Sequence, residues 1–259
     1  MFGLPTGLVG VLLVLLAVAI SVTVLYLFRN SVKFEIRKGH NEIAGFVFAT
    51  VGVLYAVVLA FVVFAVWERF TTSEQAVSHE AALVVGVYRD TELFPEPRRT
   101  QAQRALRAYV TEVMDNEWSV HGQVLPHKKP DALNRVWDIF RQADQRPGVD
   151  RISLDKAQDH LHDIEVARHA RHLSRESSLP GIFWPILVLG AIFTLFFAFI
   201  FDMGNVRVQG VLTALLAGLM TALLFLVLSL ARPFTGQVQV SKAPFEHALL
   251  QFDAIDMDR

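Results

Sequence analysis

Residues 40–70, HNEIAGFVFATVGVLYAVVLAFVVFAVWERF, form the stretch that decides the fold class of this chain. From Ile43 to Trp67 the stretch contains no Asp, Glu, Lys or Arg. An α-helix rises about 1.5 Å per residue, so about 20 apolar residues cover the ~30 Å hydrocarbon core of a bilayer. The stretch therefore predicts a helix that spans a membrane.

Three further runs of similar length also lack these four charged residue types: Pro5 to Phe28, Ser177 to Phe201, and Val208 to Ala231. Overall, 53% of the 259 residues are hydrophobic. The chain shows no strand-like alternation of useful length, and helices satisfy their backbone groups internally in lipid. We therefore predict an all-α polytopic membrane protein with four transmembrane helices.

The chain divides by composition into four parts. Between the second and third runs lies a polar insert with basic and acidic residues in near balance. Its apolar residues recur at helical spacing, as at Phe70, Val77 and Val84, so the second span should continue as a long helix that Pro95 and Pro97 stop. The predicted parts are a first transmembrane hairpin (1–67), a helical soluble domain (68–176), a second transmembrane hairpin (177–231) and a C-terminal tail (232–259).

Charge, cysteine content and motifs exclude several classes of function. Lys and Arg number 24 against 25 Asp and Glu, so the chain lacks the basic footprint of a nucleic-acid-binding protein. It has no cysteine, which removes disulfides, thiolate metal sites and cysteine nucleophiles. No phosphate-binding glycine loop, nucleophile elbow or paired-carboxylate context is found, so we predict no enzyme and no cofactor.

One cluster in the insert has the residue types of a metal site. On a helix, spacings of three, four and three would place four side chains on one face: His162, Glu165, His169 and His172. The cluster lacks the arrangements typical of zinc peptidases and di-iron bundles. We therefore interpret it as a solvated polar face, and predict no bound metal.

The interiors of the four spans contain no carboxylate, lysine, arginine or histidine side chain. Proton-coupled transporters usually need such a group at depth, so this class is disfavoured. A carrier of uncharged substrates could still use hydroxyl groups within the spans, at Thr50, Tyr55 or Thr194.

The second span has two contrasting sides. One carries small residues, at Gly45, Ala49, Gly52, Ala56 and Ala60. The other carries large apolar residues, at Phe46, Val53, Val57, Phe61 and Phe64. Around the axis of an oligomer the second side could form a narrow hydrophobic constriction, whereas in a single subunit it would face lipid or protein.

Polar residues stand at the mouths of the spans. His40 and Glu42 precede the second span, and Asp202 and Arg207 lie between the third and fourth. They could form a charged ring that filters ions, or they could anchor and cap the helices at the interface.

The fourth span carries small residues at four-residue spacing, namely Gly210, Ala214, Gly218 and Ala222. Small residues allow close approach of helix backbones in lipid, where packing drives association. We predict a helix-packing seam there, within one subunit or between subunits.

The basic residues near the membrane ends give conflicting orientations. The first loop carries Arg29, Lys33, Arg37 and Lys38, which favours an outside amino terminus. Arg168, Arg171, Arg175 and Arg232 flank the second hairpin on the side of the insert, which favours the reverse. The charges alone therefore leave the orientation open.

Several motifs together resemble one family. They are residues 40–70, the pair Glu80 and Ala81, the segment with Tyr88, Arg89, Leu93 and Pro95, and the motif of Arg232, Pro233, Phe234 and Gly236. With two spans on each side of a helical insert, this pattern resembles the bacterial bestrophin-like proteins over most of the chain.

The resemblance implies kinship with bestrophins, which are oligomeric anion channels with the second span lining the pore. It implies a homo-oligomer, by analogy a pentamer, in the plasma membrane, with the amino terminus and the helical domain in the cytoplasm. The pore-lining candidates would be Phe46, Val53, Val57, Phe61 and Phe64, with His40 and Glu42 at one mouth. The acidic calcium clasp of animal bestrophins is not found here. The alternative function is a membrane-anchored scaffold or sensor whose helical domain binds a partner.

Overall fold

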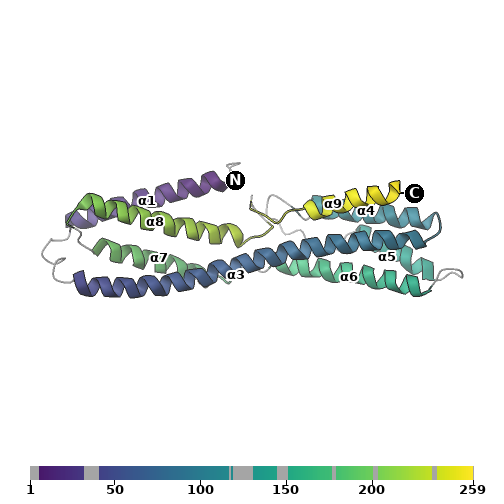
Figure 1. The fold of residues 1–259 in the computed structure, drawn as a ribbon, viewed down its shortest axis with the longest axis horizontal. Helices are drawn as coiled ribbons and strands as arrows, with labels where there is room; N and C mark the ends of the chain where they lie inside the picture. The colour runs from purple at the N-terminus through teal and green to yellow at the C-terminus, as the bar shows by residue number, and fades with distance from the viewer. Residues whose placement is uncertain are drawn as a thin grey trace. The chain divides into compact units, whose positions relative to one another are not determined.

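The structure is a computed structural model, and all of its regular secondary structure within the described residues is helical. The described residues are 6–31, 41–116, 118, 131–144, 151–176, 179–200, 204–234 and 238–258. The elements are α1 (Thr6–Ser31), α3 (Asn41–Asp90), the 3₁₀ turn η1 (Thr91–Leu93), α4 (Arg98–Asn116), α5 (Asp131–Asp144), α6 (Arg151–Glu176), α7 (Phe183–Ile200), α8 (Val206–Leu230) and α9 (Ala243–Met257), as labelled in Figure 1.

Four of the described helices are long and apolar enough to cross a membrane. The candidate spans lie in Thr6–Asn30, Gly45–Leu93, Phe183–Ile200 and Val206–Leu230. This confirms the prediction of an all-α protein with four transmembrane helices.

The chain forms two compact units. The membrane unit comprises Met1–Glu68 and Ser178–Ala231, and the helical unit comprises Arg69–Ser177 and Arg232–Arg259. Helix α3 contributes its first part to the membrane unit and its last part to the helical unit. The C-terminal segment thus groups with the insert.

In the membrane unit, α1 packs along α8 through small residues, and the two helices lie side by side in Figure 1. A Cβ added to Gly218 would lie 3.5 Å from Val18 and 3.6 Å from Val14, which is ordinary contact distance. At Gly10 the approach is closer, since an added Cβ would lie 2.7 Å from the Phe225 ring. The close packing of these two helices therefore requires the absence of a side chain at Gly10.

The members of the predicted small-residue seam differ in their surroundings. Gly210 is buried, and an added Cβ there would lie 3.9 Å from the Tyr26 hydroxyl of α1. Ala214 and Gly218 are half-buried, whereas Ala222 is exposed. Within one chain, Gly210 and Gly218 thus face α1.

Helix α7 contacts α3 at the buried Tyr55. The Tyr55 hydroxyl donates a hydrogen bond of 3.1 Å to the Leu187 carbonyl oxygen. The Tyr55 ring lies directly against Gly190, where any added Cβ would overlap it. This contact depends on the hydrogen bond of the Tyr55 hydroxyl and on the absence of a side chain at Gly190.

A buried polar side chain on α8 links this helix to both α1 and α7. Gln209 of α8 is 2% exposed and accepts a hydrogen bond of 3.0 Å from Arg29 of α1. Its amide donates a bond of 3.3 Å to the Ala198 carbonyl of α7. A buried amide is stable there because both of its ends are hydrogen-bonded.

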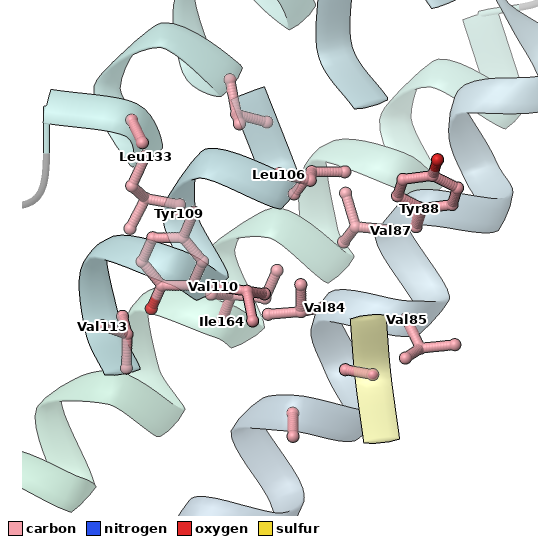
Figure 2. Close-up of a cluster of buried hydrophobic side chains, with 14 of the residues drawn as sticks. Val84, Val85, Val87, Tyr88, Leu106, Tyr109, Val110, Val113, Leu133 and Ile164 are labelled. Atoms are coloured by element: carbon pink, nitrogen blue, oxygen red, sulfur yellow. The ribbon is translucent and has the colours of Figure 1, made fainter. Parts of the chain in front are cut away.

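The core of the helical unit lies among α3, α4, α5 and α6 and includes residues of α9. Figure 2 shows its apolar side chains, and those that are completely buried include Val84, Leu106, Val110, Leu133 and Ile164. The α3 members recur every three or four residues, as at Val77, Ala81 and Val84. A soluble helix buries one such stripe and leaves its other side in water.

Helix α9 is held on this core by a stacked ring pair and a shared arginine. Phe252 stacks on Tyr88 with ring centroids 3.9 Å apart. Arg107 donates bonds of 2.7 Å to Asp253 and 2.9 Å to Asp256, and Tyr88 donates one of 2.8 Å to Asp256. Burial and the Asp256 contact raise the pKa of the Tyr88 hydroxyl, so it remains a donor at neutral pH.

We expect Gly190→Ala to destabilise the membrane unit, because the new methyl group overlaps the Tyr55 ring. Overpacking of this kind typically costs about 1–3 kcal/mol. The measurement is thermal unfolding of the detergent-purified protein. The control is Gly7→Ala, near the start of α1, where an added Cβ meets nothing within 4 Å. Equal stability of the two variants would contradict the described α3 and α7 packing.

Candidate functional site

In the first part of α3, one side of the helix is packed against other residues of the same chain. Its buried residues are Tyr55, Leu59, Val62 and Val66, each three or four positions after the last. This spacing marks one side of a helix. The side opposite this face is largely not packed by the described residues of the same chain.

The five pore-lining candidates all lie away from that packed face. Their exposed fractions are 77% for Phe46, 63% for Val53, 49% for Val57, 70% for Phe61 and 64% for Phe64. These side chains are apolar and lie in a span, so lipid or another protein surface must surround them. The structure thus places the candidates together on one open side of α3.

The small-residue side of the same span is also open within one chain. Ala49, Ala56 and Ala60 are exposed, and a Cβ added at Gly52 would meet no atom within 4 Å. This side is therefore available for close approach of another helix.

Of the predicted mouth residues, the structure describes the side chain of Arg207. His40 and Asp202 lie outside the described residues, and Glu42 lies within α3 but its side chain is outside the described part. Arg207 is exposed at the start of α8, where its backbone N–H donates to the Asn205 side chain at 3.0 Å. Asn205 therefore acts as the N-cap of α8.

The three hydroxyl groups named above as possible ligands of an uncharged substrate all donate to backbone carbonyl groups. Thr50 donates to Phe46 at 3.0 Å, and Thr194 donates to Gly190 at 2.7 Å. Tyr55 donates to Leu187, as described above. None of these donors is directed to a substrate site, which further disfavours a carrier of uncharged substrates.

The histidine cluster of α6 does not form a metal site in the described structure. No group of three or more His, Cys, Asp or Glu side chains among the described residues could hold a metal ion. Glu165 instead accepts a hydrogen bond of 2.7 Å from the Trp137 indole. His162 and His169 are exposed.

A buried ion pair, to which the sequence analysis assigned no role, lies in the core of the helical unit. Glu80 of α3 is 0% exposed and Arg171 of α6 is 2% exposed. Arg171 donates from Nε to Oε2 of Glu80 at 2.6 Å and from a terminal nitrogen to Oε1 at 3.1 Å. This is a bidentate, charge-assisted pair, the strongest geometry available to these groups.

Aromatic residues surround this ion pair and contact both of its charged groups. The Tyr109 hydroxyl donates to Oε1 of Glu80 at 2.6 Å. The Arg171 guanidinium carbon lies 5.6 Å from the centroid of Trp118 and 5.9 Å from that of Phe245. Trp118 in turn donates at 2.8 Å to the Val240 carbonyl oxygen. The buried charges thus connect α3, α4, α6 and the segment that includes α9.

Burial and the Glu80 charge raise the pKa of Tyr109 well above its ordinary value. The raised pKa means that the folded state favours the protonated hydroxyl. The protonated Tyr109 hydroxyl therefore contributes to the stability of the folded state. This contribution is fully present below the unfolded-state pKa of about 10, and is lost as the pH rises above that value.

One signal in the sequence could have revealed the pair. Glu80 lies three residues after Val77 and four before Val84, so it falls on the buried stripe of α3. A carboxylate on an apolar stripe requires a buried cation. Arg171, however, is 91 positions away, and its place in the sequence indicates only a basic residue near the second hairpin.

We expect Arg171→Met to destabilise the helical unit by about 3–5 kcal/mol, because it leaves the Glu80 carboxylate buried without its cation. The double variant Glu80→Leu with Arg171→Met should recover most of this loss. Denaturant unfolding measures both. Arg141→Met, which breaks the exposed pair with Asp138, is the control and should have little effect. A double variant no more stable than Arg171→Met would contradict the account.

The fold and the open α3 face define a class, namely a four-span helical membrane protein with a helical polar unit. The family model of the Bestrophin-like domain matches residues 15–245. The chain therefore belongs to the Bestrophin-like family, which confirms the resemblance found from the sequence motifs. No curated protein sequence matches the chain.

Solved structures share this fold. A mutant of a bacterial bestrophin homologue from Klebsiella pneumoniae matches with a TM-score of 0.72 and 12% identity, over 94% of this chain and 98% of that chain. Another mutant of the homologue matches with a TM-score of 0.67, 14% identity and coverages of 94% and 98%. A mutant of a membrane protein matches with a TM-score of 0.67, 14% identity and coverages of 95% and 98%. At these identities the likeness shows the fold.

Proposed function

We propose that this protein is a homo-oligomeric, non-enzymatic membrane channel that conducts small anions along the open face of α3. The observation that carries the proposal is the set of five large apolar side chains on one uncovered side of α3, from Phe46 to Phe64. Membership of the Bestrophin-like family supports the same function.

The chemistry of this face suits a hydrophobic constriction. Phenylalanine rings have positive edges and negative faces, so rings that present their edges can favour an anion without a fixed positive charge. A ring of such side chains can also gate by drying and wetting. The spans contain no carboxylate, lysine, arginine or histidine in their interiors, so a permeating ion would meet no fixed charge there.

A channel of this kind requires several copies around one axis. A single α3 cannot enclose a path, whereas a closed ring of subunits can. The open small-residue side of α3, with Gly52, is suited to contact between neighbouring copies. By analogy with bestrophins we propose a pentamer in the plasma membrane, with the helical unit in the cytoplasm and His40 and Glu42 at one mouth.

Halide efflux from liposomes tests the proposal. Wild-type protein should release halide, and Phe61→Ala should change the rate severalfold because it widens the constriction. The control is Phe193→Ala, which removes an aromatic side chain that is 55% exposed on α7, away from the proposed pore. It should leave the efflux rate unchanged.

Two results would contradict the channel. Absence of efflux from all three proteins at verified reconstitution would favour the alternative, a membrane-anchored scaffold or sensor whose helical unit binds a partner. Efflux that responds to Phe193→Ala and not to Phe61→Ala would mean that α3 does not line the path.

A further inference from the structure

The helical unit contains a groove between α3 and α9 that none of the roles above uses. Its volume is about 410 Å³, within the usual size range of small-molecule sites. Its floor is made of small or short apolar side chains, including Ala81, Ala82 and Gly86 of α3 and Ala248 of α9. A Cβ added at Gly86 would meet no atom within 4 Å, which is consistent with open space above the floor.

The polar residues that line this groove can all donate hydrogen bonds. They are Ser78 and Arg89 of α3 and His247 and Gln251 of α9. Within the described part of the chain, their side chains form no hydrogen bond or ion pair. No carboxylate lines the groove, so its one permanent charge is the Arg89 guanidinium.

Two of these donors lie at the same end of the groove. Arg89 follows Tyr88 and Gln251 precedes Phe252, and the rings of Tyr88 and Phe252 stack at 3.9 Å. His247 is one helical turn before Gln251. The acidic residues that follow on α9, Asp253 and Asp256, are bound by Arg107 and do not neutralise Arg89.

A groove with an apolar floor and a guanidinium at one end is complementary to a small amphipathic anion. We propose that it binds a short-chain monocarboxylate, with the carboxylate on Arg89 and Gln251 and the alkyl chain over Ala82, Gly86 and Ala248. Guanidinium and carboxylate match in charge and in bidentate geometry. The site lies within the helical unit, and its test does not require ion conduction.

Equilibrium binding of radiolabelled hexanoate to the full-length protein in a neutral detergent tests this site. Acetate, which lacks the chain, and hexanol, which lacks the charge, are the comparison ligands. Arg89→Gln removes the cation, and Ala82→Leu fills the floor from an exposed position. Arg104→Gln, at an exposed arginine on α4 away from the groove, is the matched control.

We expect saturable hexanoate binding that Arg89→Gln weakens about tenfold or more, that Ala82→Leu abolishes and that Arg104→Gln leaves unchanged. Acetate and hexanol should bind much more weakly. Binding that does not saturate, or that is equal in all variants, would overturn the proposal, as would hexanol binding as tightly as hexanoate. A change in oligomer mass in Ala82→Leu would overturn it too, since a second copy of the chain would then occupy the groove.

Discussion

The constraint on which the rest of this structure depends is that α3 is one uninterrupted helix of 50 residues. At about 1.5 Å per residue it is far longer than the ~30 Å that a bilayer core requires. Its first part must therefore be compatible with lipid, and its last part forms a core with the other helices of the helical unit. The sequence meets both demands within one continuous helix, because its exposed residues are mainly apolar in the first part and polar or small in the last part.

In the first part, packing within the chain uses one narrow face and leaves large apolar side chains such as Phe61 uncovered. In lipid this exposure carries no hydrophobic penalty, so the face is free to contact another surface.

In the last part of α3, the exposed positions are polar or small, and the buried residues from Val77 to Tyr88 are apolar with one exception. The exception is Glu80, whose charge is matched by Arg171 and whose second oxygen accepts from both Arg171 and Tyr109. A buried pair of this kind contributes less to net stability than to a single defined arrangement of helices, since an incorrect arrangement would leave a buried charge unmatched.

The parts of this fold that could be predicted from the sequence are those that local pattern determines. Absence of charge over about 25 residues predicted the four spans, and helical phase grouped Phe46, Val53 and Phe61 on one side, which the structure leaves open. Contacts between distant residues could not be predicted in this way. The pairing of Glu80 with Arg171 and of Tyr55 with Gly190 depends on tertiary packing, and a single sequence gives no sign of which distant residue is the partner. The α9 attachment through Arg107 was missed for the same reason.

The central claim is that the open face of α3 lines an ion path, and the cysteine-free chain allows a direct measurement. Single cysteines are placed along α3 at Val53, Val57, Phe61 and Phe64, and at Leu59 and Val62 on the packed face. Halide flux is then recorded before and after a small charged thiol reagent. The account predicts that the reagent changes flux through the proteins with cysteines on the open face and leaves flux through the Leu59 and Val62 variants unchanged. Equal responses at both faces, or no response at any open-face position, would contradict it.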